Sequence, residues 1–333
     1  MSTNLTIPAF LTSAVEHRGD EPALGTICDG KLRWRTWREV WDDAQTLAAT
    51  LRVAGVSPGD RVAQVSENLA LQLCGAVHVP IHVTLSGEQI AEQIAACAPR
   101  VIFVSRGELL AKFSDRLTHG KTIFVHDEHE YGASKLPLGG EAKTQAVVAP
   151  LVDEDALATI LFTSGTTGRP RGVMLSQRNL ASNAAALADA HGGSHEQTRL
   201  NILPFNHIYA RTCDLYTWIY RGSRLVLAES RETLLRDLQL VRPTALSAVP
   251  YVYQRIADGV RKLAAADEAA ALAAAFGGQM ERLTCGGGAP APGNERGDAR
   301  RGPPTARAAS AGRSPASKCG LRTTAKFSSA RPA

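Results

Sequence analysis

A segment rich in hydroxyl residues and glycine, residues 162–172, has the composition of a loop that holds the phosphates of a nucleotide. Hydroxyl groups donate to phosphate oxygens, glycines let backbone N–H groups approach, and a guanidinium pairs with the negative charge. The segment therefore predicts an ATP-using enzyme. The hydroxyl residues of the segment are Thr163, Ser164, Thr166 and Thr167, its glycines are Gly165, Gly168 and Gly172, and the guanidinium near its C-terminal end is that of Arg171.

This loop differs from a Walker A loop, in which Gly-Lys-Ser/Thr leads straight into a helix. Here Arg171 and Gly172 lead into a short apolar run, residues 173–175. An ordinary surface turn has a similar composition. We favour the nucleotide loop because four hydroxyl residues alternate with glycines, and because residues 157–162 are typical of a buried strand that would anchor it.

The length and the composition are those of a globular protein. The chain has 333 residues, of which 44% are hydrophobic, enough for one large or two ordinary domains. The net charge of +5 comes from residues 289–333, which hold 9 of the 37 Lys and Arg but only 2 of the 32 Asp and Glu. The remaining 28 basic and 30 acidic residues give a net charge of −2, so the basic balance says nothing about what the folded part binds.

The cysteines and the apolar stretches bear on the compartment. Six cysteines are scattered without Cys-x-x-Cys spacing, which fits a reduced, cytoplasmic protein without a structural zinc site. The N-terminus has no basic region before its short apolar stretch, so no signal peptide is expected. Residues 68–87 lack charged residues, but their polar and proline residues favour a buried helix and strand over a transmembrane segment.

Helical and strand patterns alternate along most of the chain. Capping boxes at Thr36 and Ser86 each predict the start of a helix, and Pro99 closes the second one. The alternation predicts an α/β domain with buried parallel strands. Further helices are expected over 69–77, 176–190, 233–240 and after Pro250; strands are expected over 61–66, 78–83, 101–104, 122–125, 157–162, 200–203, 224–227, 245–249 and 280–285.

The composition changes abruptly after Gly288. Of the 45 residues in 289–333, 34 are Ala, Arg, Pro, Gly or Ser, and the only large apolar residues are Leu321 and Phe327. Such a segment buries too little apolar surface to offset its ordering entropy, so we expect a disordered tail. A GC-rich gene read out of frame would give this composition. We therefore expect a folded part over 1–288, and a native reading frame that is lost near Gly288.

Several segments together resemble one family. Residues 162–172 resemble the phosphate-binding signature of the AMP-forming acyl-adenylate superfamily, with Arg171 in place of the usual lysine. Residues 203–211 are similar to the Leu-Pro-x-x-His-Ile/Val-x-x-Arg motif of long-chain fatty-acyl-CoA synthetases, and residues 77–86 to an upstream segment of those enzymes. Residues 284–290 resemble a Gly-Gly-Ala-Pro segment with one extra glycine. The resemblance runs from about residue 10 to 288.

The resemblance implies a fold and a reaction. The fold would be the α/β, multi-sheet and mostly parallel N-terminal domain of these enzymes, incomplete at its C-terminal side, with the C-terminal lid domain absent. The substrates would be ATP, a fatty acid and coenzyme A, with Mg²⁺ as the metal. The carboxylate attacks the α-phosphate of ATP to give acyl-AMP and pyrophosphate, and the thiol of coenzyme A then displaces AMP.

The resemblance also implies roles for single residues. His207 would lie near the reacting carboxylate, and Thr167 would bind Mg²⁺. Arg211 is interpreted as a structural ion-pair partner. The residues expected to bind the nucleotide are Thr163, Ser164, Gly165, Thr166, Thr167, Gly168, Arg171 and Gly172 at the phosphates, and Gly286, Gly287 and Gly288 at the adenine.

Other readings of the sequence stay open. The chain has no Tyr-Gly-x-Thr-Glu motif, whose glutamate binds Mg²⁺ in the family, so little or no ligase activity is expected. A non-catalytic nucleotide-binding or interaction protein is one alternative, and a fatty-acyl-AMP ligase is another. Contact with a membrane surface through the lipid substrate is compatible with these. The arginine-rich tail lacks interleaved aromatic residues, so nucleic-acid binding is not expected.

Overall fold

The computed structural model describes most of the chain as two compact units. The described residues are 4–65, 75–117, 122–125, 152–163, 170–192, 194–262, 268–286 and 324–326. The first unit comprises Met1–Asp20, Trp37–Ala185 and Pro204–Thr212, and the second comprises Glu21–Thr36, Ala186–Leu203 and Cys213–Ala333. Each unit contains one sheet.

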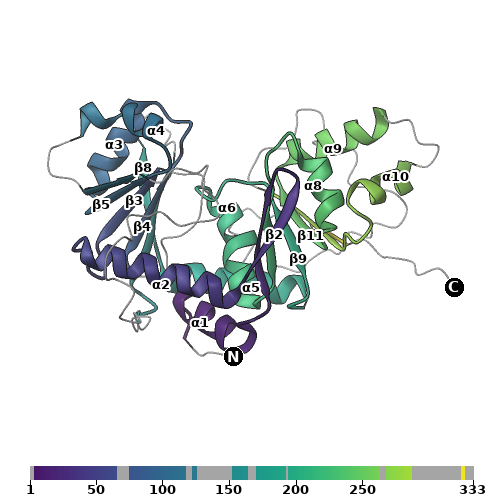
Figure 1. The fold of residues 1–333 in the computed structure, drawn as a ribbon, viewed down its shortest axis with the longest axis horizontal. Coiled ribbons are helices and arrows are strands. Elements are labelled where there is room, and N and C mark those ends of the chain that lie inside the picture. Colours follow the sequence, from purple (N-terminus) through teal and green to yellow (C-terminus); the bar gives the residue numbers. More distant parts are fainter. Residues whose placement is uncertain are drawn as a thin grey trace. The chain divides into compact units, whose positions relative to one another are not determined.

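The first unit is built on a sheet with the strand order β6-β5-β3-β4-β7-β8 (Figure 1). All neighbouring strands in it are parallel except β7 and β8, which form an antiparallel pair. The strands are β3 (Arg61–Val65), β4 (Val77–Ile81), β5 (Val101–Val104), β6 (Thr122–Val125), β7 (Leu157–Thr163) and β8 (Arg171–Ser176).

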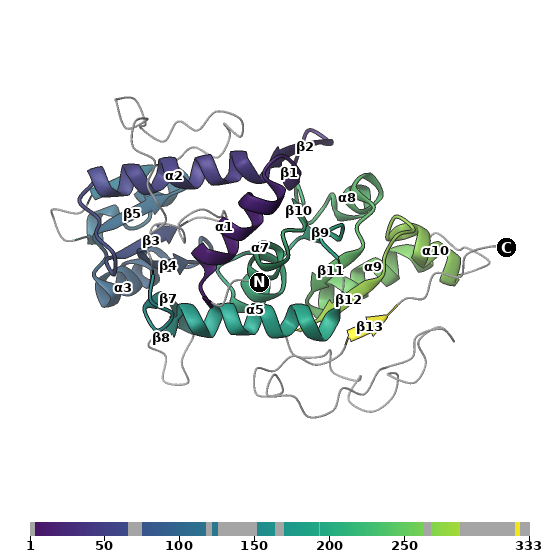
Figure 2. The ribbon, with the colours of Figure 1, turned by 90° about the horizontal axis from the view of Figure 1, so that it is seen from below.

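Helices cover both faces of this sheet. Alternate residues of β3 and β5 point to opposite sides: Ala63 and Ile102 belong to a core with α3 and α4, while Val62 and Val101 belong to a core with α2. The α1 helix contacts α2 (Figure 2). The helical segments are α1 (Ile7–Arg18), α2 (Trp37–Val53), α3 (Gly87–Cys97), α4 (Gly107–Ala111), the 3-10 helix η2 (Ser114–Arg116) and α6 (Ile208–Ala210); α5 (Gln177–His191) continues into the second unit.

The second unit is built on a sheet with the strand order β13-β12-β11-β9-β10-β1-β2. One face of it packs against α8, α9 and the end of α10, with Leu200, Val226 and Leu246 in the core. The strands are β1 (Pro22–Cys28), β2 (Lys31–Thr36), β9 (Thr198–Asn201), β10 (Arg224–Leu227), β11 (Ala245–Ala248), β12 (Arg282–Cys285) and β13 (Thr324–Lys326). The helices are α7 (Thr217–Arg221), α8 (Leu234–Val241), α9 (Pro250–Lys262) and α10 (Glu268–Ala275), and the π-helix η4 (Arg211–Tyr216) enters this unit from the first.

The mixed α/β architecture with mostly parallel sheets confirms the predicted fold class. Two of the predicted segments differ from the structure. The predicted helix 69–77 gives way to strand β4 at Val77, and its residues before 75 lie outside the described part. Residues 324–326, in the tail expected to be disordered, form β13 beside β12 (Figure 2). The rest of residues 289–333 lies outside the described part, so disorder there stays a prediction.

Candidate functional site

The predicted phosphate loop connects the two strands of the β7–β8 hairpin. Thr163, at the end of β7, pairs in register with Arg171, at the start of β8, and Phe162 pairs with Gly172. The Thr163 hydroxyl donates to the Arg171 carbonyl oxygen at 3.5 Å. Pairing of the two strands brings the ends of the loop together, so an exposed hydroxyl and an exposed guanidinium lie at its base. Five of the expected residues, Ser164, Gly165, Thr166, Thr167 and Gly168, lie outside the described part.

Gly172 lets the hairpin pack closely. A Cβ atom at this position would lie 2.9 Å from Cγ2 of Ile160, closer than real Cβ contacts. A larger residue would therefore push the strand that carries Arg171 away from its partner.

His207 lies at the N-cap of the short helix α6, in the first unit. Its backbone N–H donates to the Pro204 carbonyl oxygen at 3.3 Å, and its own carbonyl oxygen accepts from the Arg211 N–H at 3.2 Å. The residue is exposed, yet partial burial of the ring lowers the pKa of His207 below its usual value. The imidazole is therefore neutral at neutral pH and can donate or accept a hydrogen bond.

Two histidines of the β4 segment contact the segment that carries His207. The ring centroids of His82 and His207 are 5.5 Å apart, with the ring planes inclined at 56°. Four residues earlier, Nδ1 of His78 accepts from Nη2 of Arg211 at 2.9 Å, and both side chains are buried. Burial, followed by the charge of Arg211, lowers the pKa of His78 well below its usual value. Arg211 thus donates a hydrogen bond to a neutral imidazole, and its ion-pair role stays a prediction.

Gly286, the described member of the predicted adenine segment, belongs to the second unit. It directly follows β12, and its N–H donates to the Ala248 carbonyl oxygen at 3.3 Å, at the end of the neighbouring strand β11. Gly286 thus lies at the carboxyl edge of a parallel sheet, where α/β proteins place their ligands. Gly287 and Gly288 lie outside the described part.

Comparisons with known proteins decide the family. Residues 11–299 match the family described as "AMP-binding enzyme". The chain belongs to this family. It is 27% identical to a carboxylic acid reductase of Mycobacterium marinum, covering 76% of this chain and 26% of the relative, and 26% identical to long chain acyl-CoA synthetase 1 of Arabidopsis thaliana, covering 76% of this chain and 43% of the relative. It therefore spans less than half the length of these relatives.

A solved member of the same fold is the fatty acyl-adenylate ligase of L. pneumophila in complex with acyl adenylate and pyrophosphate. Its TM-score is 0.64 at 18% identity, covering 78% of this chain and 47% of that protein. This likeness supports the fold of the chain.

A buried polar network in the second unit was missed by the sequence analysis. Asp214, in η4, accepts from Nη1 of Arg199 at 3.3 Å and from Nδ2 of Asn201 at 3.0 Å. Ser247 accepts from Nη1 of Arg199 at 3.4 Å and from the Thr284 hydroxyl at 2.9 Å. Burial raises the pKa of Asp214, although Arg199 and its hydrogen bonds oppose the shift. The network ties β9, β11 and β12 to η4. Only the polar side chains within these strands could have indicated it.

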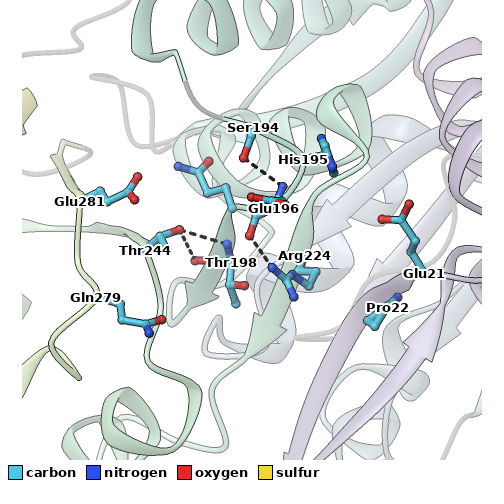
Figure 3. A pocket seen from close by; sticks show the side chains of 11 residues that line it. Glu21, Pro22, Ser194, His195, Glu196, Thr198, Arg224, Thr244, Gln279 and Glu281 are labelled. Carbon is cyan, nitrogen blue, oxygen red and sulfur yellow. Dashed lines mark hydrogen bonds between the residues drawn. The ribbon is translucent and has the colours of Figure 1, made fainter.

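A polar pocket of about 480 Å³ lies at the opposite, amino edge of the second sheet (Figure 3). Thr198 and Arg224 open strands β9 and β10 there, while Thr244 and Glu281 directly precede β11 and β12. The backbone N–H of Thr198 donates to Oγ1 of Thr244, and Nη2 of Arg224 donates to the Glu196 carbonyl oxygen, so these groups already satisfy one another. None of the residues expected to bind nucleotide lines this pocket.

The described residues contain no cluster of three or more His, Cys, Asp or Glu side chains suited to a metal ion. Thr167, the residue expected to bind Mg²⁺, is outside them. No helix among the described residues is long and apolar enough to cross a membrane.

Proposed function

We propose that the chain is part of a long-chain fatty-acid–CoA ligase, in which the β7–β8 hairpin holds the phosphates of ATP. The observation that carries the proposal is the register of this hairpin, which sets the Thr163 hydroxyl and the Arg171 guanidinium on both sides of a loop of glycine and hydroxyl residues. Arg171 supplies a permanent charge for the β- and γ-phosphates, and the hydroxyl donates to their oxygens.

In this proposal His207 binds the fatty-acid carboxylate. A neutral imidazole can donate a hydrogen bond to one carboxylate oxygen and orient the other toward the α-phosphate of ATP. The new bond joins this oxygen to the α-phosphorus, and pyrophosphate leaves. The coenzyme A thiol then attacks the acyl carbon and displaces AMP. Thr167 would hold Mg²⁺, which would neutralise phosphate charge.

Support for the fatty-acid substrate comes from the segment around His207 and from the similarity to a long chain acyl-CoA synthetase. Gly286, with Gly287 and Gly288, is proposed to lie against the adenine. A cytoplasmic location is proposed because the six cysteines show no paired spacing.

The proposal is tested by ATP binding and by ATP–pyrophosphate exchange with dodecanoate. A polypeptide of these 333 residues is expected to bind ATP but to show little or no exchange, because it lacks the Tyr-Gly-x-Thr-Glu motif. Robust exchange would contradict the proposed inactivity, and absence of ATP binding would contradict the proposal itself. If exchange is found, formation of dodecanoyl-CoA distinguishes the ligase from an enzyme that stops at acyl-AMP. Monodisperse protein that binds ATP with no response to dodecanoate would indicate a non-catalytic nucleotide-binding protein.

A further inference from the structure

His82 lies beside the candidate catalytic histidine, and the turn after β4 holds its ring in place. The backbone N–H of Thr84 approaches Nδ1 of His82 at 3.2 Å, and the Thr84 hydroxyl approaches the same atom at 2.7 Å. A backbone N–H can only donate, so Nδ1 must carry a lone pair. The neutral His82 ring therefore carries its proton on Nε2, and the Thr84 contacts fix the rotation of the ring about its side-chain bonds.

The same segment holds the chain around His207 at two points. His82 contacts the His207 ring, and His78, four residues earlier, accepts from Arg211, four residues after His207. The His78 end is anchored in the sheet, because the Thr159 hydroxyl donates to the His78 carbonyl oxygen at 2.7 Å. The two contacts differ in burial: His78 and Arg211 are buried, whereas His82 is half-buried and His207 is exposed. The contact between His78 and Arg211 thus lies in the core and fixes the position of the segment. The contact between His82 and His207 lies where a ligand can reach the His207 ring.

We propose that His82 is a positioning residue, whose ring holds the His207 imidazole in one orientation for a fatty-acid carboxylate. The inference rests on the proposed function, in which His207 contacts that carboxylate. An exposed imidazole on a short helix can adopt several side-chain rotamers, and a neighbouring ring removes some of them. A His207 ring that is already oriented binds the carboxylate with a smaller loss of conformational entropy.

The first test is a nitrogen NMR spectrum of the full chain labelled with ¹⁵N-histidine, with His82 and His207 assigned from single substitutions. We expect His82 to show the tautomer protonated at Nε2. His82→Ala should shift the His207 signals, His82→Phe should keep them close to the original because the ring contact remains, and Thr84→Ala should give an intermediate shift. Thr84 is exposed, so its substitution should leave the fold intact. His17→Ala, on the surface of α1, is the control.

The second test is the binding of dodecanoate in the presence of ATP. His82→Ala should raise the Kd for dodecanoate about tenfold, since small misplacements of an orienting group are costly. His82→Phe should bind dodecanoate with the Kd of the original chain. The Kd for ATP should be unchanged in both variants. His207 signals that are the same in His82→Ala and in the original chain would overturn the inference, as would a Kd for dodecanoate that is unchanged. If His207→Ala also binds dodecanoate normally, the proposed role of His207 fails; the His207 signals would still decide whether His82 orients that ring.

Discussion

Arg171 is the charged residue at the base of the proposed phosphate loop, and it replaces the lysine that the resemblance leads one to expect. Arginine and lysine both carry a full charge, but arginine presents it as a planar fork. We expect Arg171→Lys to bind ATP within about threefold of the original chain, and Arg171→Gln to bind about tenfold more weakly, since a hydrogen bond to a charged group contributes about 1.5–3 kcal/mol.

Isothermal titration with ATP measures both effects. Arg52→Gln, which removes an exposed charge in the last turn of α2, is the matched control and should bind normally. Equal weakening by Arg52→Gln would mean that the effect is one of general charge, and normal binding by Arg171→Gln would exclude Arg171 from the site.

His78 makes the stability of the first unit depend on pH. Its pKa in the folded chain lies well below the ordinary value of 6.5, so the unfolded chain takes up a proton that the folded chain does not. The free energy of unfolding should therefore fall as the pH drops below 6.5, by up to about 1.4 kcal/mol per pH unit for one such group. His191, whose pKa burial and nearby arginines lower to about 4, acts in the same direction in the second unit.

His78→Gln tests this, because the glutamine oxygen can still accept from Arg211 but does not titrate. Urea unfolding at pH 7 and pH 5 should show a smaller pH effect in His78→Gln than in the original chain. His17→Gln, on an exposed position of α1, should leave the pH effect unchanged. A pH effect that is the same in all three proteins would mean that His78 titrates normally.

At the scale of elements, α3 begins with Gly87, where the backbone after α4 leaves no room for a side chain. A Cβ atom at Gly87 would lie 1.8 Å from the carbonyl oxygen of Lys112, a backbone atom just after α4. Gly87→Ala should lower the free energy of unfolding by about 1–3 kcal/mol or more, because either helix must shift. Urea unfolding at pH 7 measures this change.

Gly107 offers a matched control. It is the first residue of α4, as Gly87 is of α3, but a Cβ atom there would meet nothing within 4 Å. Gly107→Ala should therefore be neutral or stabilising by up to about 1 kcal/mol, through the entropy of the unfolded chain. Similar effects at both glycines would show that the contact with Lys112 is unimportant.

The Arg199–Asp214 pair is expected to hold η4 against the second sheet. Both side chains are buried, at 2% and 0% exposure, so Asp214→Asn leaves an arginine without its carboxylate and should cost about 3–5 kcal/mol. The double substitution Arg199→Met with Asp214→Leu should recover much of this loss, since it leaves no buried charge. A thermodynamic cycle from urea unfolding measures the coupling. Additive effects of the two substitutions would contradict the pairing.

Elements whose signals are local could be predicted, and those that depend on distant pairing could not. The capping box at Ser86 and the run 101–104 predicted α3 and β5, and both hydrogen bonds of the box are present. The hairpin of β1 and β2 was missed, although Asp29-Gly30 joins these strands in a two-residue turn, which is a local hairpin signal. By contrast, β1 also pairs with β10, about 200 residues away, and no local pattern indicates that pairing. The π-helix η4 follows from backbone hydrogen bonds that no sequence spacing indicates.

The candidate site divides in the same way. The strand β7 and the loop after it could be predicted from their own sequence, and His207 from a short motif, whereas the pairing of β7 with β8 was not expected. The contacts of His207 with His82 and of Arg211 with His78 join segments that are more than 120 residues apart; Arg211 and His78 are separated by 133 residues. Such contacts arise from the strand order of the sheet, which cannot be inferred from the sequence of one chain alone.

At the scale of the whole molecule, the family match and the composition diverge after the predicted adenine segment. The match extends to residue 299, yet 34 of the 45 residues after Gly288 are Ala, Arg, Pro, Gly or Ser. A frame-shifting insertion in a run of G would leave one glycine too many in Gly286–Gly288 and this composition beyond it. We propose that the native frame is lost there.

DNA sequencing of the region after codon 288 tests the proposal. We expect one of the other two frames to encode a Tyr-Gly-x-Thr-Glu motif, and a gene with one G removed from codons 286–288 to encode a longer chain that catalyses ATP–pyrophosphate exchange with dodecanoate. In the proposed function the hairpin with Arg171 binds the phosphates, and the glutamate of the missing motif would hold the Mg²⁺ that neutralises their charge during the transfer. If neither frame contains the motif, the frameshift is refuted, and residues 289–333 must be explained as a true segment of this protein.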